Sequence, residues 1–397
     1  MTERLEIKDL YKVFSSTPAP ALEMLARGCG KSEVFEKLGV VVGLNNVSLS
    51  VPQGAVYMIM GLSGSGKSTF ARCINRLNEP TSGQVLLDGR DIVPLGEAEL
   101  REVRRTRISM VFQHFALLPN KRVIDNVEFG LKLRGVPAAE RRRRAEEVLT
   151  VVGLGRWGYH FPHELSGGMR QRVGLARALA TDADVLIMDE AFSALDPLIR
   201  TEMQDELLRL QRTLNKTILF ITHDFQEALK LGTRIAIMSE GELVREGTPQ
   251  SIVLEPGSDY VAAFTREIDR SRLFDARLAM RPAETILQSE QGTLVSEAGG
   301  CGFMVDGSGK VLGVLNASDL GRARAGGGIG PLSSDYVSVP PGAKLIEVAR
   351  SYRDGRPIAV VDDDGRLIGS LGVDDILARI ASTAPRAQAA GERHVQS

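Results

Sequence analysis

One segment of nine residues constrains the fold more than any other part of the chain. Residues 61–69 read Gly-Leu-Ser-Gly-Ser-Gly-Lys-Ser-Thr, which fits the pattern G-x-x-x-x-G-K-[ST]. An apolar, strand-sized run precedes them at 55–60, and an amphipathic helix follows, with Phe70, Cys73, Ile74 and Leu77 on one face. Because strand, loop and helix in this order build parallel sheets, the segment predicts a doubly wound α/β core.

The same segment has the chemistry of a phosphate site. Glycines let backbone N–H groups turn inward around an anion, and the N-terminus of the following helix favours negative charge. Lys67 adds a point charge, and the Ser68 hydroxyl is a ligand for Mg²⁺. The alternative, a Gly/Ser-rich surface turn, does not explain the flanking strand and helix. We therefore expect the loop to bind ATP through Gly61, Leu62, Ser63, Gly64, Ser65, Gly66, Lys67, Ser68 and Thr69.

Two acidic residues end a later buried strand. Asp189 and Glu190 follow Val-Leu-Ile-Met at 185–188. A strand of this core points such residues at the phosphate end of the sheet. We expect Asp189 to hold Mg²⁺, directly or through water, and Glu190 to act as the general base on the attacking water. A solvated acidic turn is the alternative, and the phosphate loop makes it less favourable.

A second glycine-containing helix start predicts a dimer. Residues 165–172 read Leu-Ser-Gly-Gly-Met-Arg-Gln-Arg, and Ser166, Gly167 and Gly168 at a helix N-terminus form another anion site. One active site does not need two phosphate sites. In a dimer, each ATP lies between the phosphate loop of one copy and the Ser-Gly-Gly of the other.

These motifs, in this order, resemble the ATP-binding-cassette proteins over residues 40–250. The resemblance implies that Gln113 in Val-Phe-Gln-His contacts Mg²⁺ and the attacking water. It implies that Asp196 in Ser-Ala-Leu-Asp couples the two nucleotide sites. His223 in Ile-Thr-His-Asp matches the histidine that touches the γ-phosphate and Glu190. For His223 by itself a packed histidine after a strand is the favoured interpretation, and the six motifs in register over 40–250 reverse that preference.

The match is closer to the ATPase subunit of bacterial glycine betaine/proline importers. It extends to residues 165–180 and 188–200, to a helical insertion at 19–38, and to a carboxy-terminal repeat similar to a pair of CBS modules. The resemblance implies a peripheral subunit on the cytoplasmic face of the inner membrane, with a permease and a periplasmic or lipid-anchored binding protein as partners. It implies uptake of quaternary-amine osmolytes. The rivals are a soluble, non-transport cassette ATPase and an importer of choline, carnitine or another amine.

Hydrophobic patterns predict the organisation of the ATPase part. We expect an edge strand within 1–14, two short helices in 19–38 with Val34, Phe35 and Leu38 on the apolar side of the second, and a pair of strands at 46–51 and 56–60. Residues 115–178 should be mostly helical, and strands should return at 185–188, 217–221 and 235–238. The apolar segment 115–119 has no evident internal partner, so we expect a docking groove for the permease there in preference to ordinary loop packing.

An internal repeat predicts the carboxy-terminal architecture. Residues 303–320 match 359–376 at a constant offset, and each copy reads as strand, Asp-Gly turn, strand and helix. We assign 1–275 to the nucleotide-binding domain, 280–335 and 336–381 to α+β CBS-like units, and 382–397 to a disordered tail. Gly326 and its neighbours form a flexible connector.

The chain departs from the family patterns in two places. The aromatic residue that usually stacks on adenine is missing, because the 19–38 insertion falls at its position. Phe14 and Tyr11 are the candidates to replace it, and each is equally consistent with a core aromatic residue. Nucleotide-binding CBS modules resemble G-x-x-T-x-x-D; Asp319 and Asp375 match the acid, but Asn316 and Gly372 replace the threonine. AMP sensing is therefore disfavoured, and dimer stabilisation or sensing of another signal remain open.

Composition excludes several classes of protein. The chain of 397 residues carries a net charge of −1, and its basic stretches lack interleaved aromatic residues, which argues against a nucleic-acid partner. The three scattered cysteines predict a reducing cytosol without disulfides. Apolar runs stay well below the roughly 18 residues that span a bilayer.

Overall fold

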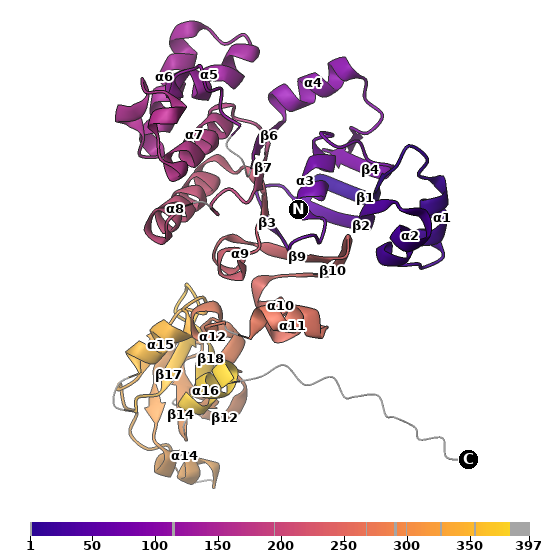
Figure 1. The fold of residues 1–397 in the computed structure, drawn as a ribbon. Coiled ribbons are helices and arrows are strands. Elements are labelled where there is room, and N and C mark those ends of the chain that lie inside the picture. The colour runs from indigo at the N-terminus through magenta and orange to yellow at the C-terminus, as the bar shows by residue number, and fades with distance from the viewer. Residues whose placement is uncertain are drawn as a thin grey trace, which may run out of the picture. The chain divides into compact units, whose positions relative to one another are not determined.

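The computed structural model describes residues 2–112, 116–193, 195–266, 268–289, 292–298, 300–325, 328–352 and 355–381 (Figure 1). The chain forms two compact units. The first contains the chain up to Ile252 together with Pro256–Phe264, and the second contains Val253–Glu255 and the chain from Thr265 onward.

An antiparallel sheet begins the first unit, in the order β2-β1-β4-β5. Its strands are β1 (Glu3–Phe14), β2 (Val41–Pro52), β4 (Ser82–Leu87) and β5 (Arg90–Asp91). The prediction of an edge strand within 1–14 was wrong, because β1 pairs with β2 on one side and β4 on the other. One face of this sheet is exposed, so polar residues alternate with apolar ones along β1. An edge strand shows the same alternation, so the sequence pattern did not distinguish the two.

A six-stranded sheet forms the centre of this unit, in the order β10-β9-β3-β8-β7-β6. Five strands are parallel and β10 is antiparallel to β9. Their bounds are β3 (Val56–Met60), β6 (Ile108–Val111), β7 (Val185–Asp189), β8 (Thr217–Ile221), β9 (Arg234–Ser239) and β10 (Glu242–Gly247). The predicted α/β core is confirmed. The predicted pairing of 46–51 with 56–60 was wrong, since β2 and β3 belong to different sheets.

Helix α3 (Lys67–Ile74) is buried in the core that the two sheets share. Phe70, Ala71, Cys73 and Ile74 have no exposed surface. They pack with strand residues such as Leu5 and Ile187 in one apolar cluster. Because the phosphate loop leads directly into α3, packing from both sides holds the loop in place.

Helices surround these sheets (Figure 1). In the insertion, α1 (Ala19–Ala26) and α2 (Lys31–Leu38) occur as predicted. Val34 of α2 is fully buried, but Phe35 and Leu38 are exposed, so the predicted apolar side was wrong for these two residues. Three further helices pack on one another, which agrees with the helical prediction for this region; they are α5 (Val123–Leu133), α6 (Ala138–Val151) and α7 (Gly167–Ala180). The other elements are α4 (Glu97–Thr106), η1 (Gly155–Trp157), η2 (Pro162–Glu164), α8 (Pro197–Leu214), α9 (Phe225–Leu231), α10 (Pro249–Leu254) and α11 (Asp259–Thr265).

The second unit contains two four-stranded sheets, β11-β18-β17-β16 and β12-β13-β14-β15. Its strands are β11 (Arg281–Pro282), β12 (Thr285–Ser289), β13 (Gly292–Ala298), β14 (Cys301–Val305), β15 (Val311–Leu315), β16 (Val337–Val339), β17 (Ile358–Val361) and β18 (Leu367–Leu371). Its helices are α12 (Arg270–Leu273), α13 (Ala276–Ala279), α14 (Ala317–Arg324), α15 (Leu345–Ser351) and α16 (Val373–Ala381). The connector glycines 326 and 327 and the tail lie outside the described residues.

The internal repeat is confirmed in detail. β14, β15 and α14 correspond to β17, β18 and α16. In both turns an aspartate side chain accepts from the backbone N–H four residues on: Asp306 from Lys310 at 2.9 Å and Asp362 from Arg366 at 2.8 Å. The two turns also meet, because the N–H of Leu367 donates to the carbonyl of Gly309. The repeats therefore pack as a pair of similar halves.

Candidate nucleotide-binding site

The phosphate loop closes around the ammonium group of Lys67. Its Nζ donates to the carbonyls of Gly61 and Leu62, both at 2.8 Å, and the residue is 6% exposed. Burial lowers the pKa of Lys67, while the carboxylates of Glu190 and Asp189 act in the opposite direction. Gly66 has φ of 101°, and a Cβ there would lie 2.7 Å from the carbonyl oxygen of Gly43. Position 66 therefore requires glycine, both for its left-handed backbone and for its close contact with β2.

Two oxygen ligands meet at the start of α3. The Ser68 hydroxyl donates to Asp189 Oδ1 at 3.0 Å, which joins the phosphate loop to the end of β7. Asp189 is 1% exposed, and burial raises its pKa, partly offset by the Ser68 hydrogen bond. A buried carboxylate beside a hydroxyl provides the hard oxygen ligands that Mg²⁺ prefers. Mg²⁺ keeps several waters and phosphate oxygens, so it requires few protein ligands.

Glu190 lies next to His223. The Nδ1 of His223 is 3.4 Å from Glu190 Oε1. The backbone of Glu190 is left-handed, with φ of 49°, and its N–H donates to the carbonyl of Ile221. Its own carbonyl accepts from the side chains of Gln171 and Ser193. These bonds hold an otherwise unfavourable backbone and direct the carboxylate toward the end of β8.

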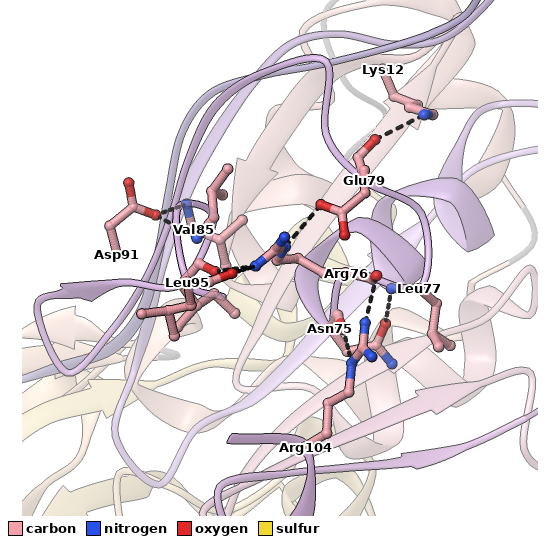
Figure 2. A network of polar contacts seen from close by, with 11 residues as sticks. Lys12, Asn75, Arg76, Leu77, Glu79, Val85, Asp91, Leu95 and Arg104 are labelled. Carbon is pink, nitrogen blue, oxygen red and sulfur yellow. Dashed lines mark hydrogen bonds and ion pairs between the residues drawn. The ribbon is translucent and has the colours of Figure 1, made fainter. Parts of the chain in front are cut away.

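The far end of α3 is held by a polar network (Figure 2). The guanidinium of Arg104, from α4, donates to the carbonyls of Asn75 and Arg76 at 2.9 and 2.6 Å. Arg76 donates to the Leu95 carbonyl and pairs with Glu79. A cation at the carboxyl end of a helix satisfies its last carbonyls and interacts favourably with its dipole. The helix that begins at the phosphate loop is thus fixed at both ends.

A cavity of about 1070 Å³ opens beside the phosphate loop. Glu190, His223 and most of the loop line it. Phe14 also lines it, whereas Tyr11 packs against the apolar cluster beneath the insertion. Of the two aromatic residues expected to meet adenine, the structure therefore places Phe14 at the cavity.

Sequence reasoning missed several residues at this site, of which Lys31, Phe35 and Tyr260 come from outside the motifs. Lys31 and Phe35 of the insertion line the cavity. The Tyr260 hydroxyl accepts from the N–H of Leu62 at 3.2 Å and donates to the carbonyl of Met238 at 3.1 Å, so it joins the loop to β9. These three residues lie far from the loop in sequence and belong to no motif. The i, i+4 spacing of Lys31 and Phe35 indicates a shared helix face, but not what that face covers.

The second expected anion site lies at the start of another helix. Ser166 caps α7 by accepting from the N–H of Met169, and Asp196 caps α8 by accepting from the N–H of Ile199. An added Cβ at Gly167 would meet no atom within 4 Å. None of Ser166, Gly167, Gly168 and Asp196 is among the residues that line the cavity in the described part of this copy. Gln113, expected to contact Mg²⁺ and water, lies outside the described residues.

The residues at the nucleotide-binding positions of the CBS pattern make contacts within the repeat. Asn316 caps α14 by accepting from the N–H of Asp319, and Asp319 pairs with Arg322 at 3.1 Å. In the second half the N–H of Gly372 donates to Asp375, which also pairs with Arg281 at 2.8 Å. Both aspartates thus already have cationic partners within this unit.

Comparison with known proteins agrees with this geometry. Residues 44–193 match the profile of the family described as ABC transporter, and 329–382 match the CBS domain. The glycine betaine/proline betaine transport system ATP-binding protein ProV of Salmonella typhimurium is 46% identical over 382 residues, covering 93% of this chain and 95% of that protein. The glycine betaine transport ATP-binding protein OpuAA of Bacillus subtilis is 44% identical over 376 residues, covering 92% and 90%.

The chain belongs to the ATP-binding subunits of ABC transporters. The resemblance to the glycine betaine group is confirmed, and the activity of the chain is ATP hydrolysis coupled to transport. A solved cassette dimer in a post-hydrolysis state, bound to ADP and phosphate, has 33% identity and a TM-score of 0.54, and covers 62% of this chain and 98% of its own. In the part of the chain that the structure describes, no helix is long and apolar enough to cross a membrane.

Proposed function

We propose that two copies of this chain enclose two ATP molecules and power an importer of glycine betaine, proline or a related quaternary-amine osmolyte. The observation that carries the proposal is the convergence of Lys67, Ser68 with Asp189, and Glu190 with His223 on one cavity. The names of the similar proteins supply the substrate class.

The chemistry of each group follows from its position. Lys67 and the loop N–H groups bind the β- and γ-phosphates, and Ser68 and Asp189 would hold Mg²⁺, which neutralises charge on those phosphates. The Glu190 carboxylate accepts a proton from a water whose oxygen attacks the γ-phosphorus. The bond from that phosphorus to the β–γ bridging oxygen then breaks, and the products are ADP and inorganic phosphate. His223 positions the Glu190 carboxylate and lies near the transferred group.

The second copy completes the site in this proposal. Gly167 is open and Ser166 caps α7. Ser166 is exposed, and its hydroxyl can still donate to a γ-phosphate bound on the loop of a partner copy, where a helix N-terminus favours the anion.

The permease is proposed to dock beside residues 116–119. Phe115, the first residue of the segment 115–119 expected to dock, lies outside the described residues, and the backbone of the rest bonds to side chains of two helices. The Ala116 carbonyl accepts from Arg177 of α7, and the Leu118 N–H donates to Asn126 of α5. A segment tied to both helices would transmit their movement to a membrane partner on the cytoplasmic face. A periplasmic or lipid-anchored protein would deliver the osmolyte to that permease.

Substitution of the proposed base tests the sandwich. Glu190→Gln keeps the size of the side chain but removes the proton acceptor, so we expect hydrolysis to fall by about 100-fold or more. ATP should then remain bound, and the variant should elute as a dimer on size-exclusion chromatography with ATP and Mg²⁺. Glu190→Gln combined with Lys67→Ala is the control and should stay monomeric. A Glu190→Gln variant that stays monomeric with ATP contradicts the proposal.

A further inference from the structure

The insertion places one face of α2 on the wall of the nucleotide cavity. Lys31, Ser32, Phe35 and Glu36 all line it. They recur at the i, i+1, i+4 and i+5 positions of one helix face. Val34, on another face, is fully buried against β1 and β2. The helix is thus anchored by its apolar residue while this second face meets the cavity.

Two large aromatic side chains are exposed at this wall. Phe14 is 47% exposed and Phe35 is 55% exposed. Exposed apolar surface beside a polar cavity suits a ligand that is charged at one end and apolar and flat at the other. The phosphate loop meets the charged end. The aromatic wall is therefore complementary to a nucleobase.

Lys31 joins this helix to the phosphate-binding side of the cavity. Its Nζ is 3.0 Å from Glu240 Oε2, in the turn between β9 and β10, and donates to the Gly64 carbonyl at 3.3 Å. Its side chain is 22% exposed. One ammonium group therefore connects the insertion, the phosphate loop and the turn after β9. Because Lys31 and Phe35 are one helical turn apart, this contact also sets the position of Phe35.

We propose that α2 forms a base-binding wall that this chain adds to its cassette, in which Phe35 packs against the adenine of ATP and Lys31 is the positioning residue. This inference rests on the proposed function, because it takes ATP as the occupant of the cavity. It adds a second aromatic contact to that of Phe14 and assigns the insertion a role in nucleotide binding.

Titration calorimetry with ATP on the full chain tests the role of Phe35. Phe35→Ala removes the ring from a half-exposed position, so the fold is retained and the Kd for ATP rises by about ten-fold, in line with base–aromatic stacking. Phe35→Tyr keeps the ring and the affinity. The matched control is Leu38→Ala, since Leu38 is also exposed on α2 but does not line the cavity. An unchanged Kd in Phe35→Ala, or an equal loss in Leu38→Ala, overturns the inference.

Inorganic tripolyphosphate separates the base from the phosphates. Its competitive inhibition constant against ATP hydrolysis is expected to be the same in Phe35→Ala as in the unaltered chain. If Phe35→Ala weakens the binding of tripolyphosphate as much as the binding of ATP, the site is disturbed as a whole and the inference is overturned.

Lys31→Met tests the positioning role. Its control is Lys37→Met, because Lys37 pairs with Glu33 on the same helix. Lys31→Met is expected to raise the Kd for ATP several-fold, Lys31→Arg to restore it, and Lys37→Met to leave it unchanged. In the Phe35→Ala background, Lys31→Met is expected to have little further effect. If Lys31→Met lowers the affinity for ATP in that background by its full single-variant factor, the positioning role is overturned.

The outcome for the unaltered chain keeps the two proposals apart. Failure of that chain to bind ATP contradicts the proposed function. Binding of ATP that is insensitive to both Lys31 and Phe35 contradicts this inference alone.

Discussion

At the scale of single residues, the site depends on a close approach of backbone to side chain at Gly43. A Cβ on this residue would lie 2.8 Å from the Phe14 ring and 3.0 Å from the Thr69 methyl group. Its carbonyl oxygen is also close to Gly66. Gly43 thus lets the aromatic residue of β1 lie beside the phosphate loop.

Gly43→Ala is expected to weaken ATP binding without unfolding the chain. The added methyl group must displace the Phe14 ring or Thr69 by a few tenths of an ångström, because real Cβ atoms rarely make such close contacts. Loss of one well-placed aromatic contact costs about 0.5–1.5 kcal/mol, so the Kd for ATP should rise about two- to ten-fold. Gly96→Ala is the control, since a Cβ there meets nothing within 4 Å. Equal affinities of the two variants would contradict this account of Gly43.

Residues inside motifs were predictable, and residues that complete the cavity were not. The order of glycines around Lys67 and the acids after a buried strand each follow from local chemistry. Gly43, Lys31 and Tyr260 contact the loop only because distant elements fold against it. No local pattern carries that information. Phe35 was misassigned because helical spacing identifies an apolar residue but cannot distinguish a core from a cavity wall.

At the scale of elements, α3 transmits order from the core to the phosphate loop. Its apolar residues are buried in the core that the two sheets share, and Arg104 binds the carbonyls at its end (Figure 2). The chain continues through Arg76, which has φ of 53° and contacts Leu95 and Glu79. The network therefore ends the helix and also directs the chain toward β4.

Arg104→Met is expected to destabilise the nucleotide-binding unit. The substitution removes two hydrogen bonds from a charged donor and leaves the carbonyls of Asn75, the C-cap of α3, and of Arg76, the next residue, without that partner, which costs about 1.5–3 kcal/mol. For a unit of this size the Tm should fall by about 3–10 °C in a thermal unfolding scan. Arg101→Met on the same helix is the control, because within the described residues the hydrogen bond of the exposed Arg101 guanidinium goes to the Glu97 carbonyl of its own helix. A Tm unchanged from that control would show that the network does not stabilise α3.

Strand identity was predictable where burial is complete and uncertain where it is partial. Continuous apolar runs identified β3, β7 and β8, whose residues are all buried. For β1 the alternating pattern identified a strand but not its neighbours, because β4 was not anticipated from its sequence, Ser-Gly-Gln-Val-Leu-Leu. Pairing between distant strands depends on the whole fold and leaves little trace in either strand.

At the scale of the whole molecule, the nucleotide-binding unit has two sets of functional residues on different elements. One set is the loop 61–69 with Glu190 and His223 at the cavity, joined by Asp189 through its hydrogen bond with Ser68. The other, at 166–168, lies at the start of α7 and is not among the residues that line it. A chain that acted alone would have no use for the second set. The proposed dimer uses both, since each copy supplies one set to each of the two ATP sites.

Mixing two inactive variants tests that division of labour. Lys67→Ala removes the cation from the phosphate loop, and Ser166→Arg places a bulky side chain at the start of α7. In a dimer of two identical variant chains, both ATP sites are therefore inactive. A mixed dimer contains one site with both defects and one with neither. An equal mixture that assorts freely should therefore recover up to about a quarter of the unaltered ATPase rate, because half of the dimers are mixed and each has one intact site of two. The rate should fall when either variant is diluted before mixing with ATP. Activity no greater than the sum of the two separate variants would mean that 61–69 and 166–168 do not meet across two copies.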